Sequence, residues 1–161
     1  MTDFLEAIDE FLASFTPEEQ AVTRVVFRRL LEGHGIRLEA VAATLEMPLT
    51  VVEKAVDHLV ERGTMERDPD TGEVVAARGL SLAETPHRLT LAGRQLYAFC
   101  AVDAVGIPAA LEVAARVESR CHACGAPVTL AIAGGAVTDA SPGTVIWAAE
   151  RDLTRSLRRY T

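Results

Sequence analysis

The sequence predicts an α+β protein in which a winged-helix-like helical N-terminal unit packs on a small C-terminal α+β unit. Helical spacing of apolar residues dominates the N-terminal part, a turn-rich hairpin pattern follows it, and short strand-like runs then alternate with one apolar helical run. We place the division at residue 80, so the two expected units are residues 1–80 and residues 81–161.

The N-terminal unit is expected to contain four helices. An amphipathic helix covers residues 1–15. A second helix starts with Thr16 as N-cap and Pro17 at its first position, and it stops at the glycine pair around residue 34. A third runs from Leu38 to Leu45, and a fourth covers residues 51–61. A hairpin with an Asp-Pro-Asp-Thr-Gly turn follows over residues 65–75.

Three helices followed by a hairpin is the order of a winged helix-turn-helix, which invites a DNA-binding interpretation. The charges oppose it. The helix that would enter the major groove carries Lys54 and Arg62 against three acids, and the whole chain has 16 Lys and Arg against 23 Asp and Glu, a net charge of −7. Nucleic-acid binding depends on neutralising phosphates, so we expect a structural winged helix and no nucleic-acid partner.

The C-terminal unit is expected to mix strands and helices. The turn signals are Gly106-Ile107-Pro108, which should break the apolar helix, the segment Cys124–Pro127, and Gly134-Gly135. The expected elements are a strand at 88–91, a helix at 96–104, strands at 114–120, 128–133 and 144–148, and a basic helix at 150–161 that carries Arg151, Arg155, Arg158 and Arg159.

The chain is expected to be cytoplasmic. Its first residues are acidic, unlike a signal peptide. The most apolar run, residues 96–115, contains Asp103 and Glu112, which favours a buried helix over a membrane span. Three cysteines are too few for a disulfide scaffold and suit a reducing compartment, where thiols stay free for metals or chemistry.

The first candidate site is Cys100 with Asp103. On a helix, a spacing of three puts the thiol and the carboxylate on one face, within reach of one small ligand. The surrounding sequence is apolar, which favours the protonated carboxyl, so the two groups suit a nucleophile and a proton donor. The alternative is structural: Cys100 as a small core residue and Asp103 as a cap of a neighbouring turn.

The second candidate is the Cys121-His122-Ala123-Cys124 segment at a glycine turn. Two thiols with two residues between them can hold one soft metal ion. A complete site needs two more ligands, for which Cys100 and then Asp103, His122 or water are candidates. The alternative is two incidental cysteines in a tight turn.

The remaining histidines, His34, His58 and His87, fall on expected surface or loop positions.

The segment from Leu96 to Asp103, continuing to Ile107-Pro108-Ala109, resembles the active-site segment of organomercurial (alkylmercury) lyases. Cys121 follows Cys100 at the interval found in that family, and the Gly125–Val128 stretch is also similar. The resemblance is strongest over residues 88–130. It extends loosely to the N-terminus, because those lyases also begin with a winged-helix-like unit that does not bind DNA.

The resemblance implies protonolysis of a carbon–mercury bond, which gives a hydrocarbon and Hg(II). The thiolate matching Cys100 attacks mercury, which as a soft metal prefers thiolates. The carboxylate matching Asp103 delivers the proton. The family's second mercury-binding cysteine falls just past Thr161 in this numbering. Cys124, in contrast, is a thiol that most lyases of the family lack.

Our leading hypothesis is therefore an organomercurial-lyase-like protein that binds mercury through Cys100, with Asp103 as proton donor and with Cys121 and Cys124 as assisting ligands. It is an enzyme only if a second thiolate reaches the metal held by Cys100. The expected partners are a small organomercurial or metal ion and external thiols, without an organic cofactor or a membrane. The alternatives are a non-catalytic winged-helix sensor or structural protein that holds zinc, copper or mercury on the three cysteines, and an inactive interaction module.

Overall fold

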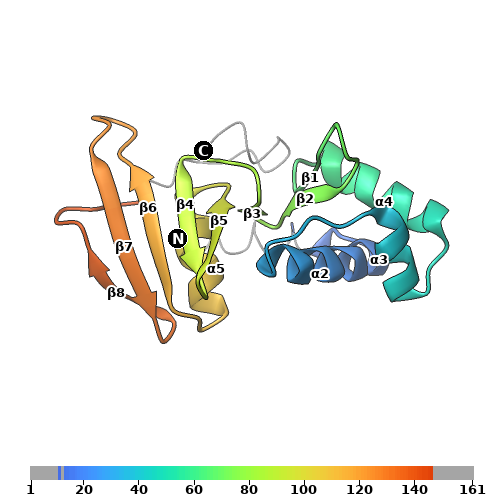
Figure 1. Cartoon of the computed structure of the whole chain (residues 1–161), viewed down its shortest axis with the longest axis horizontal. Helices are drawn as coiled ribbons and strands as arrows, with labels where there is room; N and C mark the ends of the chain where they lie inside the picture. The colour runs from blue at the N-terminus through green and yellow to red at the C-terminus, as the bar shows by residue number, and fades with distance from the viewer. Residues whose placement is uncertain (1–10, 12, 147–161) are drawn as a thin grey trace.

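A computed structural model gives the fold, and it describes residue 11 and residues 13–146 (Figure 1). Most of the expected first helix and the whole expected basic helix at 150–161 lie outside the described residues. The expected strand at 144–148 lies partly outside them, and residues 144–146 are not in a strand.

The described residues form an α+β fold with four complete helices and one eight-stranded antiparallel sheet of strand order β1-β2-β3-β5-β4-β6-β7-β8. The helices are α2 (Pro17–Leu31), α3 (Leu38–Leu45), α4 (Leu49–Glu61) and α5 (Ala101–Ala110). The strands are β1 (Met65–Arg67), β2 (Val74–Ala77), β3 (Leu80–Ser81), β4 (His87–Leu91), β5 (Arg94–Ala98), β6 (Ala115–Arg120), β7 (Pro127–Ala133) and β8 (Ala136–Ala140).

The helices fall into two groups (Figure 1). Helices α2, α3 and α4 pack on one another next to the β1–β2 hairpin, whereas α5 packs against the strands from β4 to β8. The short strand β3 connects the two regions, because it pairs with β2 on one side and with β5 on the other. No helix among the described residues combines the length and the apolar character that crossing a membrane requires.

One apolar core extends through both regions. It joins Val26 and Leu30 of α2 to Leu80, Leu89 and Leu96 of the sheet, all of them fully buried. Burial of a side chain of this size contributes about 1.5–3 kcal/mol. The sheet and the core are continuous across residue 80, so the division into units 1–80 and 81–161 stays a prediction.

The sequence prediction for residues 96–104 is wrong. Leu96 and Ala98 lie in β5, where they pair with Leu89 and His87 of β4, and the helix begins only at Ala101. The segment is apolar because it is buried on the sheet, and burial alone does not distinguish a strand from a helix.

The expected break at residues 106–108 is also wrong, because α5 continues through Gly106 and Pro108 to Ala110. Ala104 and Pro108 are buried on the side of α5 that faces the sheet. This packing compensates for the poor helix propensity of glycine and proline. Besides β5, two further strands were not predicted: β3, which has too few residues to show a period, and β8, which is exposed throughout.

A capping box fixes the start of α2. The Thr16 hydroxyl accepts a hydrogen bond from the Glu19 N–H at 3.2 Å, and the Glu19 carboxylate accepts one from the Thr16 N–H at 2.8 Å. Glu19 is buried and also hydrogen-bonds the His58 ring on α4. Burial raises the pKa of Glu19, but the bonds from His58 and Thr16 and the positive charges of His58 and Arg62 lower it further, so its pKa is below the ordinary value.

We expect Thr16→Ala to lower the free energy of unfolding by about 1 kcal/mol, because the N3 amide loses its acceptor at a helix start. Thr44→Ala is the matched control, since the Thr44 hydroxyl only bonds back to the Ala40 carbonyl within α3 and its loss should change stability by less than about 0.5 kcal/mol. Urea unfolding followed by circular dichroism measures both. Equal losses would contradict the capping role.

Candidate active site

Cys100 and Asp103 meet at the first turn of α5. Cys100 is the N-cap of the helix, and its Sγ accepts a hydrogen bond from the Asp103 N–H at 3.4 Å. The thiol in turn donates to Asp103 Oδ2 at 3.0 Å. The spacing of three therefore brings the two groups together as expected, but through the geometry of a helix start rather than two positions on one helical face.

The thiol is shielded from solvent while the carboxyl is half-buried. Cys100 is 3% exposed and follows the buried Phe99 at the end of β5. A sulfur at an N-cap is unusual, because oxygen side chains are the common caps. The arrangement leaves a soft nucleophile and an ionisable acid in direct contact at the edge of the core.

Gly79 forms the support beneath the Asp103 carboxyl. A Cβ added at Gly79 would lie 2.3 Å from Asp103 Cγ, closer than any real contact allows, so the carboxyl rests directly on the glycine backbone. Gly79 also has φ +81°, in the turn between β2 and β3, and its carbonyl accepts a hydrogen bond from the Phe99 N–H at 2.8 Å. Gly79 could not be assigned to the site from the sequence, since a glycine next to a turn carries no local sign of a distant carboxyl.

His87 is a second neighbour of the pair, although its position in the sequence predicted a surface or loop location. It is the first residue of β4, pairs in register with Ala98, and its Nδ1 hydrogen-bonds Ser119 Oγ at 2.7 Å. Burial lowers the pKa of His87, although the negative charge of Asp103 opposes the shift. The imidazole is therefore mainly neutral at neutral pH, next to the candidate site.

Cys121 and Cys124 occupy a closed turn between β6 and β7. The Gly125 N–H donates to the Cys121 carbonyl and the Cys121 N–H donates to the Ala126 carbonyl, both at 2.8 Å. Both cysteines are free thiols; Cys121 is partly exposed and Cys124 exposed. The backbone N–H groups of Cys124 and Ala123, and then the Cys124 side chain, lower the pKa of the Cys121 thiol, so this turn favours a thiolate.

The two thiol segments lie at the same edge of the sheet. Strands β5 and β6 both pair antiparallel with β4, so they run in the same direction and end on the same side. Cys100 follows β5 and Cys121 follows β6, with the start of β4 between them. Two strand spacings separate these segments by about 10 Å.

The three cysteines do not converge into one site. Among residue 11 and residues 13–146, no three His, Cys, Asp or Glu side chains are grouped closely enough to hold a metal ion. The described residues therefore do not bring Cys100, Cys121 and Cys124 together as the expected three-thiolate cluster. A structural zinc site needs four ligands, and zinc and copper find no support here.

Comparison with known proteins identifies the family. The alkylmercury lyase family model matches residues 80–160. An alkylmercury lyase of Pseudomonas putida is 37% identical over 147 residues, which cover 88% of this chain and 65% of that protein. The chain belongs to the alkylmercury lyase family. The alkylmercury lyase of Bacillus cereus is 34% identical over 125 residues, which cover 75% of this chain and 55% of that protein.

A solved structure has the same fold. The mercury-bound form of MerB2 superposes with a TM-score of 0.91 over 98% of this chain and 77% of that one, at 24% identity. The chain spans about 55–65% of the length of these curated alkylmercury lyases. Family membership thus confirms the resemblance to alkylmercury lyases, and the fold confirms the mixed α+β architecture.

We expect Gly79→Ala to destabilise the protein by about 1–3 kcal/mol more than Gly93→Ala does, because only the first substitution forces the Asp103 carboxyl to move. The two glycines have nearly equal positive φ, +81° and +78°, but a Cβ at Gly93 meets no atom within 4 Å. Gly93→Ala therefore isolates the backbone strain. Denaturant unfolding of both variants measures the difference, and equal destabilisation would contradict the support role of Gly79.

We expect Cys121 to react with iodoacetamide at a lower pH in the folded chain than in the urea-unfolded chain, because the turn that stabilises its thiolate exists only in the folded state. Mass-spectrometric mapping of alkylation against pH gives the two midpoints for this residue. Coincident midpoints would show that the turn does not stabilise the thiolate.

Proposed function

We propose that this chain cleaves the carbon–mercury bond of organomercurials by protonolysis, with Cys100 as the mercury-binding nucleophile and Asp103 as the proton carrier. The observation that carries the proposal is the 3.0 Å hydrogen bond from the Cys100 thiol to Asp103 Oδ2. Family membership supports the same reaction, because the similar proteins are named alkylmercury lyases.

The Cys100 thiol supplies the proton that the reaction consumes, and its hydrogen bond to Asp103 gives the path of that proton. When an organomercurial R–Hg–X binds, an S–Hg bond forms at Cys100, X⁻ leaves, and the thiol proton passes to the Asp103 carboxylate. The Hg–C bond then breaks, and its electron pair takes the proton from Asp103 to form R–H. Hg(II) remains on the sulfur beside the restored carboxylate, so one proton enters and leaves Asp103 in each cycle.

The position of the pair at the edge of the core favours this proton transfer. Cys100 is buried beneath the first turn of α5, and Asp103 is held between Gly79 and the helix. A proton held away from bulk water is delivered to a carbon that develops negative charge rather than lost to solvent. The neutral ring of His87 adds no competing positive charge next to the carboxyl.

Release of Hg(II) needs further thiolates. We assign Cys121 and Cys124 as assisting ligands, because both are free, partly or fully exposed, and located at the same sheet edge as Cys100. Two external thiolates complete the removal of Hg(II), and Cys100 regains a proton from solvent. A reducing compartment such as the cytoplasm supplies such thiols, and thiolates are the preferred ligands of soft metals.

The N-terminal helices and the β1–β2 hairpin form, in this proposal, a structural winged-helix-like unit. Helix α2 contributes Val26 and Leu30 to the common core. The candidate recognition helix α4 directs Val52, Ala55, Val56 and Leu59 into that core, while its exposed charges are mainly acidic. Such a helix has a packing role and lacks the cationic surface that a nucleic-acid partner requires.

We expect Asp103→Asn to lower benzene release from phenylmercury by about 10²–10⁴-fold, the usual contribution of a general acid, while the protein still binds mercury through Cys100. Cys100→Ser should lose both benzene release and mercury binding, because a hydroxyl is a poor ligand for a soft metal. Gas chromatography of benzene and elemental analysis of bound mercury, in excess small thiol, measure the two effects.

Asp70→Asn is the control for the loss of one carboxylate, since Asp70 lies exposed in the β1–β2 turn. It should release benzene at the wild-type rate. If Asp103→Asn also releases benzene at that rate, Asp103 does not carry the proton and the proposed mechanism is wrong.

A further inference from the structure

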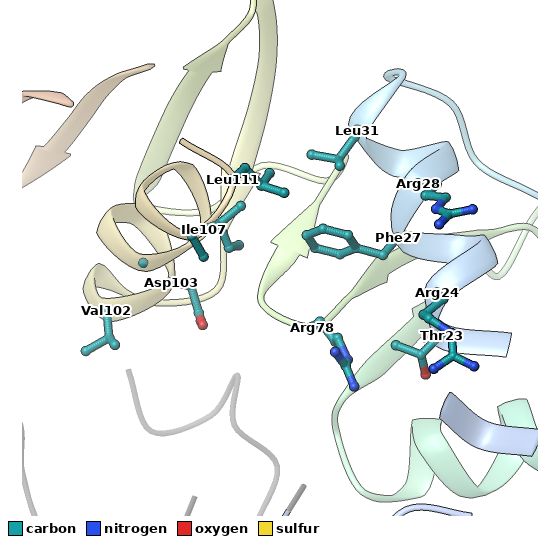
Figure 2. Close-up of a pocket in the computed structure, with 12 residues that line it drawn as sticks. Thr23, Arg24, Phe27, Arg28, Leu31, Arg78, Val102, Asp103, Ile107 and Leu111 are labelled. Atoms are coloured by element: carbon teal, nitrogen blue, oxygen red, sulfur yellow. The ribbon is translucent and has the colours of Figure 1, made fainter. Parts of the chain in front are cut away.

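A cavity of about 440 Å³ lies between α2 and α5, with Asp103 at its edge. Figure 2 shows Phe27 and Leu31 extending from α2 toward α5, opposite Ile107 and Leu111. These four side chains make the wall largely apolar. A cavity of this size lies in the range that accommodates a single substituted ring.

The cavity lies next to Asp103, and this position indicates which part of the substrate it holds. The inference rests on the proposed function. Asp103, Ile107 and Leu111 follow one another at intervals of four residues, so they lie along one face of α5. If Cys100 holds mercury at the start of α5, the organic group bonded to that mercury extends along this face of the helix. The cavity then holds the leaving organic group.

Three arginines also line the cavity, and they give it a chemical preference. Arg24 and Arg28 stand one turn apart on α2 next to Phe27, and Arg78 lies between the two helices (Figure 2). Asp103 is the single carboxylate in the lining, and the Cys100 thiol already donates to it. The lining therefore has an excess of positive charge, in a chain whose net charge is −7.

These arginines differ from the others in the part of the chain that the structure describes. There, Arg29, Arg37, Arg67, Arg88 and Arg116 pair with carboxylates, Arg62 stacks on Phe11 and Phe15, and Arg120 bonds a carbonyl. Over the same described residues, Arg24, Arg28, Arg78 and Arg94 have no such partner, and three of these four line the cavity.

Arg78 adds an independent observation. It is the first residue of the two-residue turn that joins β2 to β3, and it has φ +49°. Turns of this kind favour asparagine or glycine, and an arginine there is strained. A long cationic side chain therefore occupies a position where local structure alone favours a small residue, and it extends next to the cavity.

We propose that the cavity binds the organic group of the substrate and that Arg24, Arg28 and Arg78 select organomercurials whose organic group carries a carboxylate. The apolar wall holds the hydrocarbon part, and the guanidinium groups, which match carboxylate geometry, hold the charged substituent. The preferred substrates are thus mercurated carboxylic acids, ahead of simple alkyl or aryl mercurials.

The test compares 4-carboxyphenylmercury with phenylmercury, which share the ring and the carbon–mercury bond. For both compounds we measure kcat/KM in the wild-type protein and the affinity, by competition with a small thiol, in the Asp103→Asn variant. The ratio of the value for 4-carboxyphenylmercury to that for phenylmercury gives the carboxylate preference. We expect the carboxylated compound to be favoured about fivefold or more at low salt. Each of Arg24→Gln, Arg28→Gln and Arg78→Gln should lower this ratio by about two- to fivefold, the range for an exposed ion pair. High salt should lower it as well.

Arg94→Gln is the matched control, because Arg94 is likewise an arginine without a carboxylate partner among the described residues but lies outside the cavity lining. It should leave the ratio unchanged. The inference is overturned if the ratio is one or less in the protein that retains Arg24, Arg28 and Arg78. It is also overturned if the three substitutions leave the ratio unchanged.

The outcomes separate this inference from the proposed function. Benzene release without a carboxylate preference overturns the inference and leaves the lyase function in place. An arginine-dependent preference in affinity without hydrocarbon release supports the cavity assignment and overturns the lyase function. A cationic analogue, 4-trimethylammoniophenylmercury, should bind more weakly than phenylmercury, and equal affinity of the two would also contradict the charge preference.

Discussion

The hydrogen-bonded pair of Cys100 and Asp103 links the fold of this protein to its proposed chemistry. The same sulfur that caps α5 donates its proton to Oδ2 of Asp103. The start of the helix and the reactive pair are therefore one structure, and the position of α5 on the sheet sets the position of both groups. Any change that moves this first turn changes the thiol and its proton acceptor together.

The support of that pair comes from a distant part of the chain. The β2–β3 turn brings Gly79 under the Asp103 carboxyl, and the bond from the Phe99 N–H to the Gly79 carbonyl joins this turn to the segment before Cys100. The short strand β3 is consequently more important than its two residues suggest. It joins the helical region to the sheet and holds the glycine where the carboxyl needs space.

Local signals in the sequence predicted part of this arrangement. The Thr16–Pro17 start of α2 and the spacing of Cys100 and Asp103 depend on neighbouring residues, so both could be inferred without a structure. Gly79 and His87 could not, because antiparallel pairing and a tertiary contact bring them to the site. The same limit explains residues 96–98, whose apolar character reflects burial in β5, and the expected three-thiolate cluster, which required a long-range approach that the described residues do not make.

The separation of the thiols suits two successive tasks better than one shared site. In the proposed reaction, breaking the carbon–mercury bond requires a proton kept from solvent, and the buried Cys100 with its partner Asp103 suits this step. In the same proposal, handing Hg(II) to external thiols requires access to solvent and thiolate character, which are properties of the Cys121–Cys124 turn. A single site cannot be both dry and open, so thiol groups about two strands apart at one sheet edge allow each step its own environment.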